Sequence, residues 1–137
     1  MNNESARIQP LLTKANNHLG KAKEHLEQSE RHSARAGTHL TETEQYSGQA
    51  KSHLDLAKHL NTRASAALDQ GRRDEARSLA NRARGHIEQA RTAQAASEAN
   101  TAQTEKHLQA ARGHKARTVA HIHAFERYRA RIEKISS

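Results

Sequence analysis

The chain has 137 residues, of which 34% are hydrophobic, and its 23 Lys and Arg against 15 Asp and Glu give a formal net charge of +8. Its aromatic residues are one Phe and two Tyr, and it lacks Cys, which excludes a conventional globular core, a disulfide framework and Cys-ligated zinc. No apolar run approaches the roughly 20 residues of a membrane span, and the first residues do not resemble a signal peptide. We therefore expect a single cytoplasmic domain, residues 1–137, that does not bind membranes.

The first predicted element is a long helix over residues 5–69. Its apolar residues alternate four and three apart, which is typical of the a and d positions of a coiled coil. The a position holds Leu12, Leu19, Leu26, Ser33, Leu40, Ser47, Leu54, Asn61 and Leu68. The d position holds Ile8, Ala15, Ala22, Ser29, Ala36, Thr43, Ala50, Ala57 and Ala64. This pattern predicts a seam of Leu and Ala along one face of the helix.

A turn is predicted at residues 70–74, followed by a second helix over residues 75–135. Gly71 stands where a glycine commonly ends a helix, and Asp74 and Glu75 suit the first turn of the next one. The heptad then resumes less regularly. Its a position includes Ala80, Ile87, Leu108 and Ile122, and its d position includes Ala76, Ala83, Ala90, Ser97, Ala111 and Thr118.

Folding the chain back at Gly71 places residue i near residue 143 − i, so that Leu54 approaches Ile87 and Ala90. The polar stretches 41–47 and 94–101 then also meet. The predicted fold class is all-α, a long antiparallel helical hairpin that forms a coiled coil. Because Ala buries little surface, two such hairpins could pair into a four-helix bundle, or residues 37–48 and 99–104 could bend so that one chain folds as a four-helix bundle. We favour straight arms, since the heptad continues in frame through both stretches.

Histidine is the most unusual component, with eleven residues in the chain. Nine of them occupy the g position, next to the seam: His18, His25, His32, His39, His53, His86, His107, His114 and His121. Tyr46 and Tyr128 share this frame. In an antiparallel pair the g positions of both helices lie on one flank. We therefore predict a histidine-lined edge, with His18 near His121, His25 between His114 and His121, and His32 near His107 and His114.

Three roles are open for this edge. The rings could simply widen the apolar stripe, form an association face that protonation below about pH 6 would disrupt, or bind a metal ion with partners from both helices. Seven-residue spacing puts successive rings of one helix about 10.5 Å apart, too far for one ion, so we expect no resident metal or cofactor. The candidate partner-binding residues are His18, His25, His32, His39, His107, His114, His121 and Tyr128.

Positive charge is concentrated in the second helix. Residues 1–71 hold 9 basic and 8 acidic side chains, whereas residues 72–137 hold 14 basic and 7 acidic ones. Either this is a solvated coiled-coil exterior, or it is a surface for phosphate groups. The candidate nucleic-acid-binding residues are Arg72, Arg73, Arg77, Arg84, Arg117, Arg127, Arg129 and Arg131. The lack of aromatic stacking residues favours contact with the phosphate backbone without sequence readout.

No catalytic arrangement is evident, since the glycines are scattered singly and a two-helix hairpin offers no dry pocket. We therefore predict that the protein is not an enzyme. The favoured function is a helical scaffold or adaptor that acts by protein–protein interaction or homo-oligomerisation along a helical face. The alternatives are a sequence-nonspecific nucleic-acid-binding protein that uses the Arg-rich helix, and a His-rich metal-responsive bundle.

Overall fold

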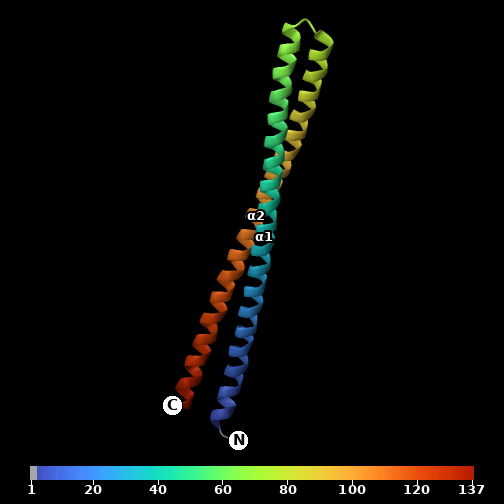
Figure 1. Cartoon of the computed structure of the whole chain (residues 1–137). Helices are drawn as coiled ribbons and strands as arrows, with labels where there is room; N and C mark the ends of the chain where they lie inside the picture. The colour runs from blue at the N-terminus through green and yellow to red at the C-terminus, as the bar shows by residue number, and fades with distance from the viewer. Residues whose placement is uncertain (1–2) are drawn as a thin grey trace. The chain divides into compact units, whose positions relative to one another are not determined.

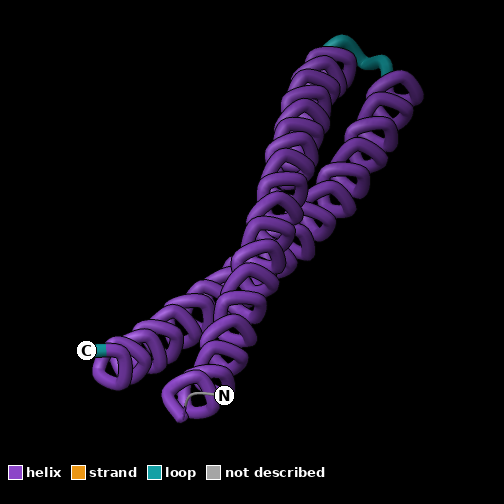
Figure 2. Tube along the Cα trace, turned by 90° about the horizontal axis from the view of Figure 1, so that it is seen from below, coloured by secondary structure: helices purple, strands orange, loops and turns teal. Residues whose placement is uncertain are grey.

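The computed structural model describes residues 3–137, which form two long helices. Helix α1 spans Asn3–Asp69 with 67 residues, and α2 spans Arg73–Ser136 with 64 residues. Figure 2 shows helix throughout the described chain apart from the connection between α1 and α2 and the C-terminal residue. The two helices pack against each other, so the predicted all-α helical hairpin is confirmed. Both helices begin two residues earlier than the sequence pattern suggested.

The chain reverses direction at Gly71, as predicted. Gly71 has a φ of 80°, a left-handed conformation that favours glycine. Its N–H donates to the Leu68 carbonyl over 3.0 Å, and the N–H of Arg72 donates to the Ala67 carbonyl over 2.9 Å. These two bonds form a Schellman motif, which satisfies the last carbonyls of α1. The Arg72 carbonyl then accepts the first hydrogen bond of α2, from Ala76.

The helical hairpin divides into two compact units. We call Met1–Ala36 with Glu105–Ser137 the terminal unit, and Gly37–Thr104 the turn unit. Each contains one segment of α1 packed antiparallel on one segment of α2 (Figure 1). Neither helix is interrupted at residues 37–48 or 99–104. Residues 3–137 thus form two helices rather than four, and the predicted alternative of a four-helix bundle within one chain is wrong.

The contact between the helices follows the d position. Its buried residues form what we call the alanine seam: Ala15, Ala22, Ser29, Ala36, Ala50, Ala57, Ala76, Ala83, Ala90, Ser97, Ala111 and Thr118. Small side chains here let the two backbones approach closely. Ser29 donates a hydrogen bond to the Ala111 carbonyl over 3.1 Å, so this polar seam residue is satisfied by the opposite helix.

The prediction that Leu shares this seam is wrong. The a-position residues Leu12, Leu19, Leu26, Leu40, Leu54, Leu68, Leu108 and Ile122 are between 39% and 58% exposed. The g position is the more buried flank, and near the turn it carries Leu60 and Leu79, each only 4% exposed. Positions a and g flank d on opposite sides of a helix. Where the two helices approach each other on the alanines, the g-position rings and leucines contact the opposite helix and are partly or fully buried. The a-position leucines on the other side of the seam stay exposed to solvent.

The pairing register is one helical turn from the predicted one. The g-position contacts described below place residue i opposite residue 139 − i, instead of the predicted 143 − i. The midpoint of this pairing lies at the end of α1. The polar stretches 41–47 and 94–101 do meet, through a 3.0 Å hydrogen bond between the Ser47 and Ser97 hydroxyls. Within residues 3–137, no helix has an apolar segment long enough to cross a membrane.

Candidate functional site: the histidine edge

The g-position histidines of α1 and α2 meet in pairs, each joined by its two Nδ1 atoms. In the terminal unit the Nδ1–Nδ1 distances are 2.8 Å for His18–His121, 2.9 Å for His25–His114 and 3.0 Å for His32–His107. In the turn unit the distance is 2.9 Å for His53–His86. We call these the four histidine pairs. They arise because the antiparallel register brings every seventh residue of α1 opposite a g residue of α2.

Each pair is a hydrogen bond that requires different tautomers in its two neutral rings. A neutral imidazole has one N–H and one bare nitrogen, so one ring of the pair donates its Nδ1–H and the other accepts at Nδ1. The accepting ring therefore carries its own proton on Nε2. A proton added to the accepting Nδ1 would remove the hydrogen bond and set two N–H groups against each other, one of them on a positive ring. Each pair consequently tolerates one proton between its Nδ1 atoms but not two.

In the terminal unit the pairs stack on one another. The rings of His25 and His121 are 5.6 Å apart with planes at 8°, and those of His32 and His114 are 5.5 Å apart at 12°. At one end, His18 stacks on Tyr128 at 5.7 Å. Hydrogen-bonded and stacked contacts thus alternate along one flank. All the predicted neighbours of His18, His25 and His32 are confirmed.

Tyr128, at the end of this stack, makes cation–π contacts with two basic side chains. Lys14 Nζ lies 5.9 Å from the centre of its ring, and Arg131 Cζ lies 5.6 Å from it. Such contacts contribute about 0.5–1 kcal/mol at exposed sites. Arg131, which the sequence suggested as a phosphate ligand, is therefore engaged with an aromatic ring of its own helix.

His39 has a different partner from the other pairs. Its Nδ1 lies 3.1 Å from Oδ1 of Asn100, so the imidazole donates to the amide oxygen. Its Nδ1 is also 3.8 Å from the Glu42 carboxylate, which would interact favourably with a protonated ring. Asn100 was not among the predicted site residues. Its g position in the heptad is the signal that could have identified it.

Two histidines have shifted acidities. Partial burial and the positive charges of His25, Arg117 and His32 lower the pKa of His114. Partial burial and the charges of His18, His25 and Lys21 lower the pKa of His121. Both rings are therefore neutral at pH 7, with a nitrogen lone pair available to accept a hydrogen bond or to ligate a cation.

The candidate phosphate-binding residues Arg72, Arg73, Arg77, Arg84, Arg117, Arg127, Arg129 and Arg131 are all exposed. Some have carboxylate partners within α2, since Arg72 pairs with Glu75 at 2.7 Å and Arg129 with Glu133 at 3.3 Å. Arg77 and Arg84 share a helix position with Arg91, so these three form one basic stripe in the turn unit.

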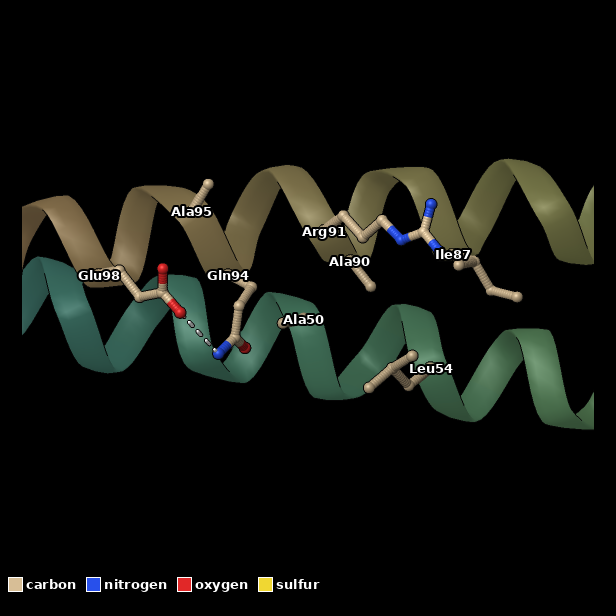
Figure 3. Close-up of a pocket in the computed structure, with 8 residues that line it drawn as sticks. All are labelled: Ala50, Leu54, Ile87, Ala90, Arg91, Gln94, Ala95 and Glu98. Atoms are coloured by element: carbon tan, nitrogen blue, oxygen red, sulfur yellow. Dashed lines mark hydrogen bonds between the residues drawn. The ribbon is translucent and has the colours of Figure 1, made fainter.

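The flank opposite the histidines was not predicted to be exposed. We call the leucine edge the exposed a-position residues of this flank, which are Leu12, Leu19, Leu26, Leu40, Leu54, Leu68, Leu108 and Ile122. In the turn unit it contains a groove of about 330 Å³ lined by Leu54, Ile87, Ala90 and neighbouring residues. Figure 3 shows Leu54 of α1 beside Ile87 of α2, with the Gln94–Glu98 hydrogen bond at the other end of the groove. The predicted approach of Leu54 to Ile87 and Ala90 is thus confirmed.

Among residues 3–137, no three His, Asp or Glu side chains gather closely enough to surround one metal ion. Each histidine pair by itself offers two ring nitrogens. Comparison with known proteins found no matching family, no similar curated protein and no similar solved structure.

Proposed function

We propose that the protein is a non-enzymatic helical scaffold that self-associates through the leucine edge. The observation that supports this is a row of half-exposed leucines at the a position of α1, interrupted by Ser33, Ser47 and Asn61, beside a helix contact made mainly of alanine. Leu19, Leu40 and Leu54 are 42%, 52% and 52% exposed. Exposed apolar side chains that gather on one face of a helix are typical of association surfaces rather than of scattered surface leucines.

A second copy of the chain is the partner that fits this edge. Two leucine edges placed face to face are self-complementary, and they would complete a four-helix bundle around a leucine core. Burying a Leu side chain completely contributes about 2 kcal/mol, so covering each half-exposed leucine contributes about 1 kcal/mol. The alanine seam supplies much less burial per residue, and a paired hairpin is therefore substantially more stable than a single one.

Charge opposes this association and gives it a characteristic salt dependence. Each copy carries a net +8, and added salt screens the repulsion between copies. We expect dimer formation to strengthen as salt increases from about 0.05 M to 0.5 M.

The test is the solution mass. A chain of 15.3 kDa is expected to sediment as a dimer at micromolar concentration. Leu54→Glu, which places a charge in the groove of the leucine edge, should produce monomers. Leu56→Glu is the matched control, because Leu56 is 46% exposed but lies on a different face of α1. A monomeric wild-type chain, or equal effects of the two variants, would rule out this proposal.

Nucleic-acid binding is a second candidate function, which the exposed stripe of Arg77, Arg84 and Arg91 favours. Binding to a short DNA duplex should then weaken steeply between about 50 mM and 200 mM salt, because phosphate contacts release counterions. Replacing Arg77 and Arg84 by Gln should reduce both the affinity and the salt slope, whatever the sequence of the duplex. This salt dependence has the opposite sign from that of self-association, so the two functions can be distinguished.

A further inference from the structure

The four histidine pairs repeat one geometry that the helical scaffold does not require. In each pair, two Nδ1 atoms from different helices point at each other across 2.8–3.0 Å. Alanine or leucine at the same position closes the flank elsewhere, as Leu60 and Leu79 do. Two opposed nitrogen lone pairs need a positive centre between them, which is either a shared proton or a metal cation.

The ligand number selects the kind of cation. Zn²⁺ in proteins takes four ligands in a tetrahedron, and Mg²⁺ and Ca²⁺ take six or more oxygen atoms. Monovalent d¹⁰ ions of the copper group are soft, bind imidazole well and form stable complexes with two nitrogen atoms in a line. We propose that each of the four histidine pairs binds one such ion, Cu⁺, between its two Nδ1 atoms.

The change in geometry that this needs is small. A metal–nitrogen bond of about 2 Å on each side requires the two Nδ1 atoms to separate by about 1 Å from their present distance. Rotation of both half-buried rings about their side-chain bonds can supply this without moving the helices. Protons also balance: the donating ring transfers its proton from Nδ1 to its bare Nε2, so a neutral pair binds the ion as two neutral imidazoles with no net proton release.

The surrounding charges favour a monovalent ion over a divalent one. Arg117 lies near His114, and Lys21 lies near His121. Repulsion between these side chains and a bound cation is twice as large for a divalent ion as for a monovalent one.

The test is titration of the full chain with Ag⁺, which has the coordination preferences of Cu⁺ and needs no reductant. Native mass spectrometry in chloride-free buffer at pH 7.5 should show four bound ions per chain. His25→Gln should reduce the number to three, and His25→Gln with His53→Gln should reduce it to two. His59→Gln is the matched control, because His59 is exposed and outside the pairs, and it should leave four.

Circular dichroism of every variant shows whether the helices are retained, and His53→Gln gives an independent reading in the turn unit if His25→Gln weakens the terminal unit. In nitrogen NMR spectra, the Nδ1 signals of paired histidines should shift on addition of Ag⁺, while those of His59 and His123 should not. Binding of no ions by the folded chain, or an equal loss in His59→Gln and His25→Gln, would overturn the proposal. Displacement of all Ag⁺ by equimolar Zn²⁺ would overturn the choice of a monovalent ion.

Discussion

At the scale of single residues, the paired imidazoles differ from ordinary surface histidines because one nitrogen of each is committed to a partner. The accepting Nδ1 must stay unprotonated for the bond to exist. In the terminal unit the rings also stack, so that His25 contacts both His114 and His121. A change in one pair therefore reaches the pairs stacked on either side of it.

Acidification should lower the free energy of unfolding. In the folded protein the pKa values of His114 and His121 lie below the ordinary value of 6.5, so the unfolded chain binds more protons at mildly acidic pH. This contribution to stability is complete above about pH 6.5 and is lost as the pH falls through the lowered folded-state values. We expect a lower thermal midpoint at pH 5 than at pH 7.5, measured by circular dichroism.

The groups that face these two rings are the titratable His18, His25 and His32 and the permanently charged Lys21 and Arg117. The control is His59→Gln, which should show the same pH difference as the wild type. His121→Phe, which removes one of the shifted rings, should show a smaller difference. Identical midpoints at both pH values in the wild type would contradict the prediction.

At the scale of the helices, the hairpin depends on a left-handed residue at the turn and on small residues in the seam. The Schellman motif at Gly71 uses a backbone conformation that side chains disfavour. The alanine seam keeps the helices near enough for the histidine rings to bond across the interface. Either feature can be altered by one side chain without changing the helix-forming tendency of the remaining sequence.

Gly71→Ala should destabilise the protein by about 1–2 kcal/mol, because a non-glycine residue is strained at positive φ. Gly85→Ala is the opposite case. Gly85 lies inside α2, an added Cβ meets no atom within 4 Å, and replacing an interior helix glycine stabilises by about 1 kcal/mol. Urea unfolding of both variants should show a lower free energy of unfolding for Gly71→Ala and a higher one for Gly85→Ala. A lower free energy of unfolding for Gly85→Ala would contradict this prediction.

Ala83→Leu should overfill the seam, since Ala83 is 1% exposed. Forcing extra methylene groups into a packed contact costs about 1–3 kcal/mol, and it should also expose His86 by moving the helices apart. Ala80→Leu adds the same group three residues earlier at an exposed a position, and it should be tolerated. Hydrogen exchange of the turn unit should accelerate in the first variant only.

At the scale of the whole molecule, most of the larger apolar side chains lie outside the contact between the helices. The core cluster near the turn contains only six buried residues, four of them alanine. By contrast, ten large hydrophobic residues are at least 39% exposed, eight of them on the leucine edge. This distribution is the reverse of that in a self-sufficient domain, and it is the basis for proposing that two copies share one leucine core.

If the copies share a core, stability should depend on protein concentration. The thermal midpoint of the wild type should rise between about 1 µM and 100 µM, because mass action favours the associated state. Leu54→Glu should have a lower midpoint that does not vary with concentration, whereas Leu56→Glu should behave like the wild type. A concentration-independent midpoint in all three proteins would indicate that the single hairpin is stable on its own.

The sequence alone determined the two helices, the place of reversal and the grouping of the histidines. Seven-residue periods in both halves of the chain favour helices over strands, and Gly71 stands where a glycine commonly ends a helix. Nine histidines in one heptad position share a flank when the chain folds back. The partners of His18, His25 and His32 follow from that. Asn100 occupies the same g position opposite His39, but the prediction considered only histidine and tyrosine at this position and therefore missed it.

Only the tertiary structure decided which flank of the alanine seam closes. Positions a and g lie equally far from d around one helix, so a pattern read along one chain cannot rank them. The choice depends on what faces each position across the contact. On the g flank, rings meet rings at hydrogen-bonding distance, and Leu60 meets the cluster containing Leu79, whereas the leucines of the a flank are left exposed to a partner.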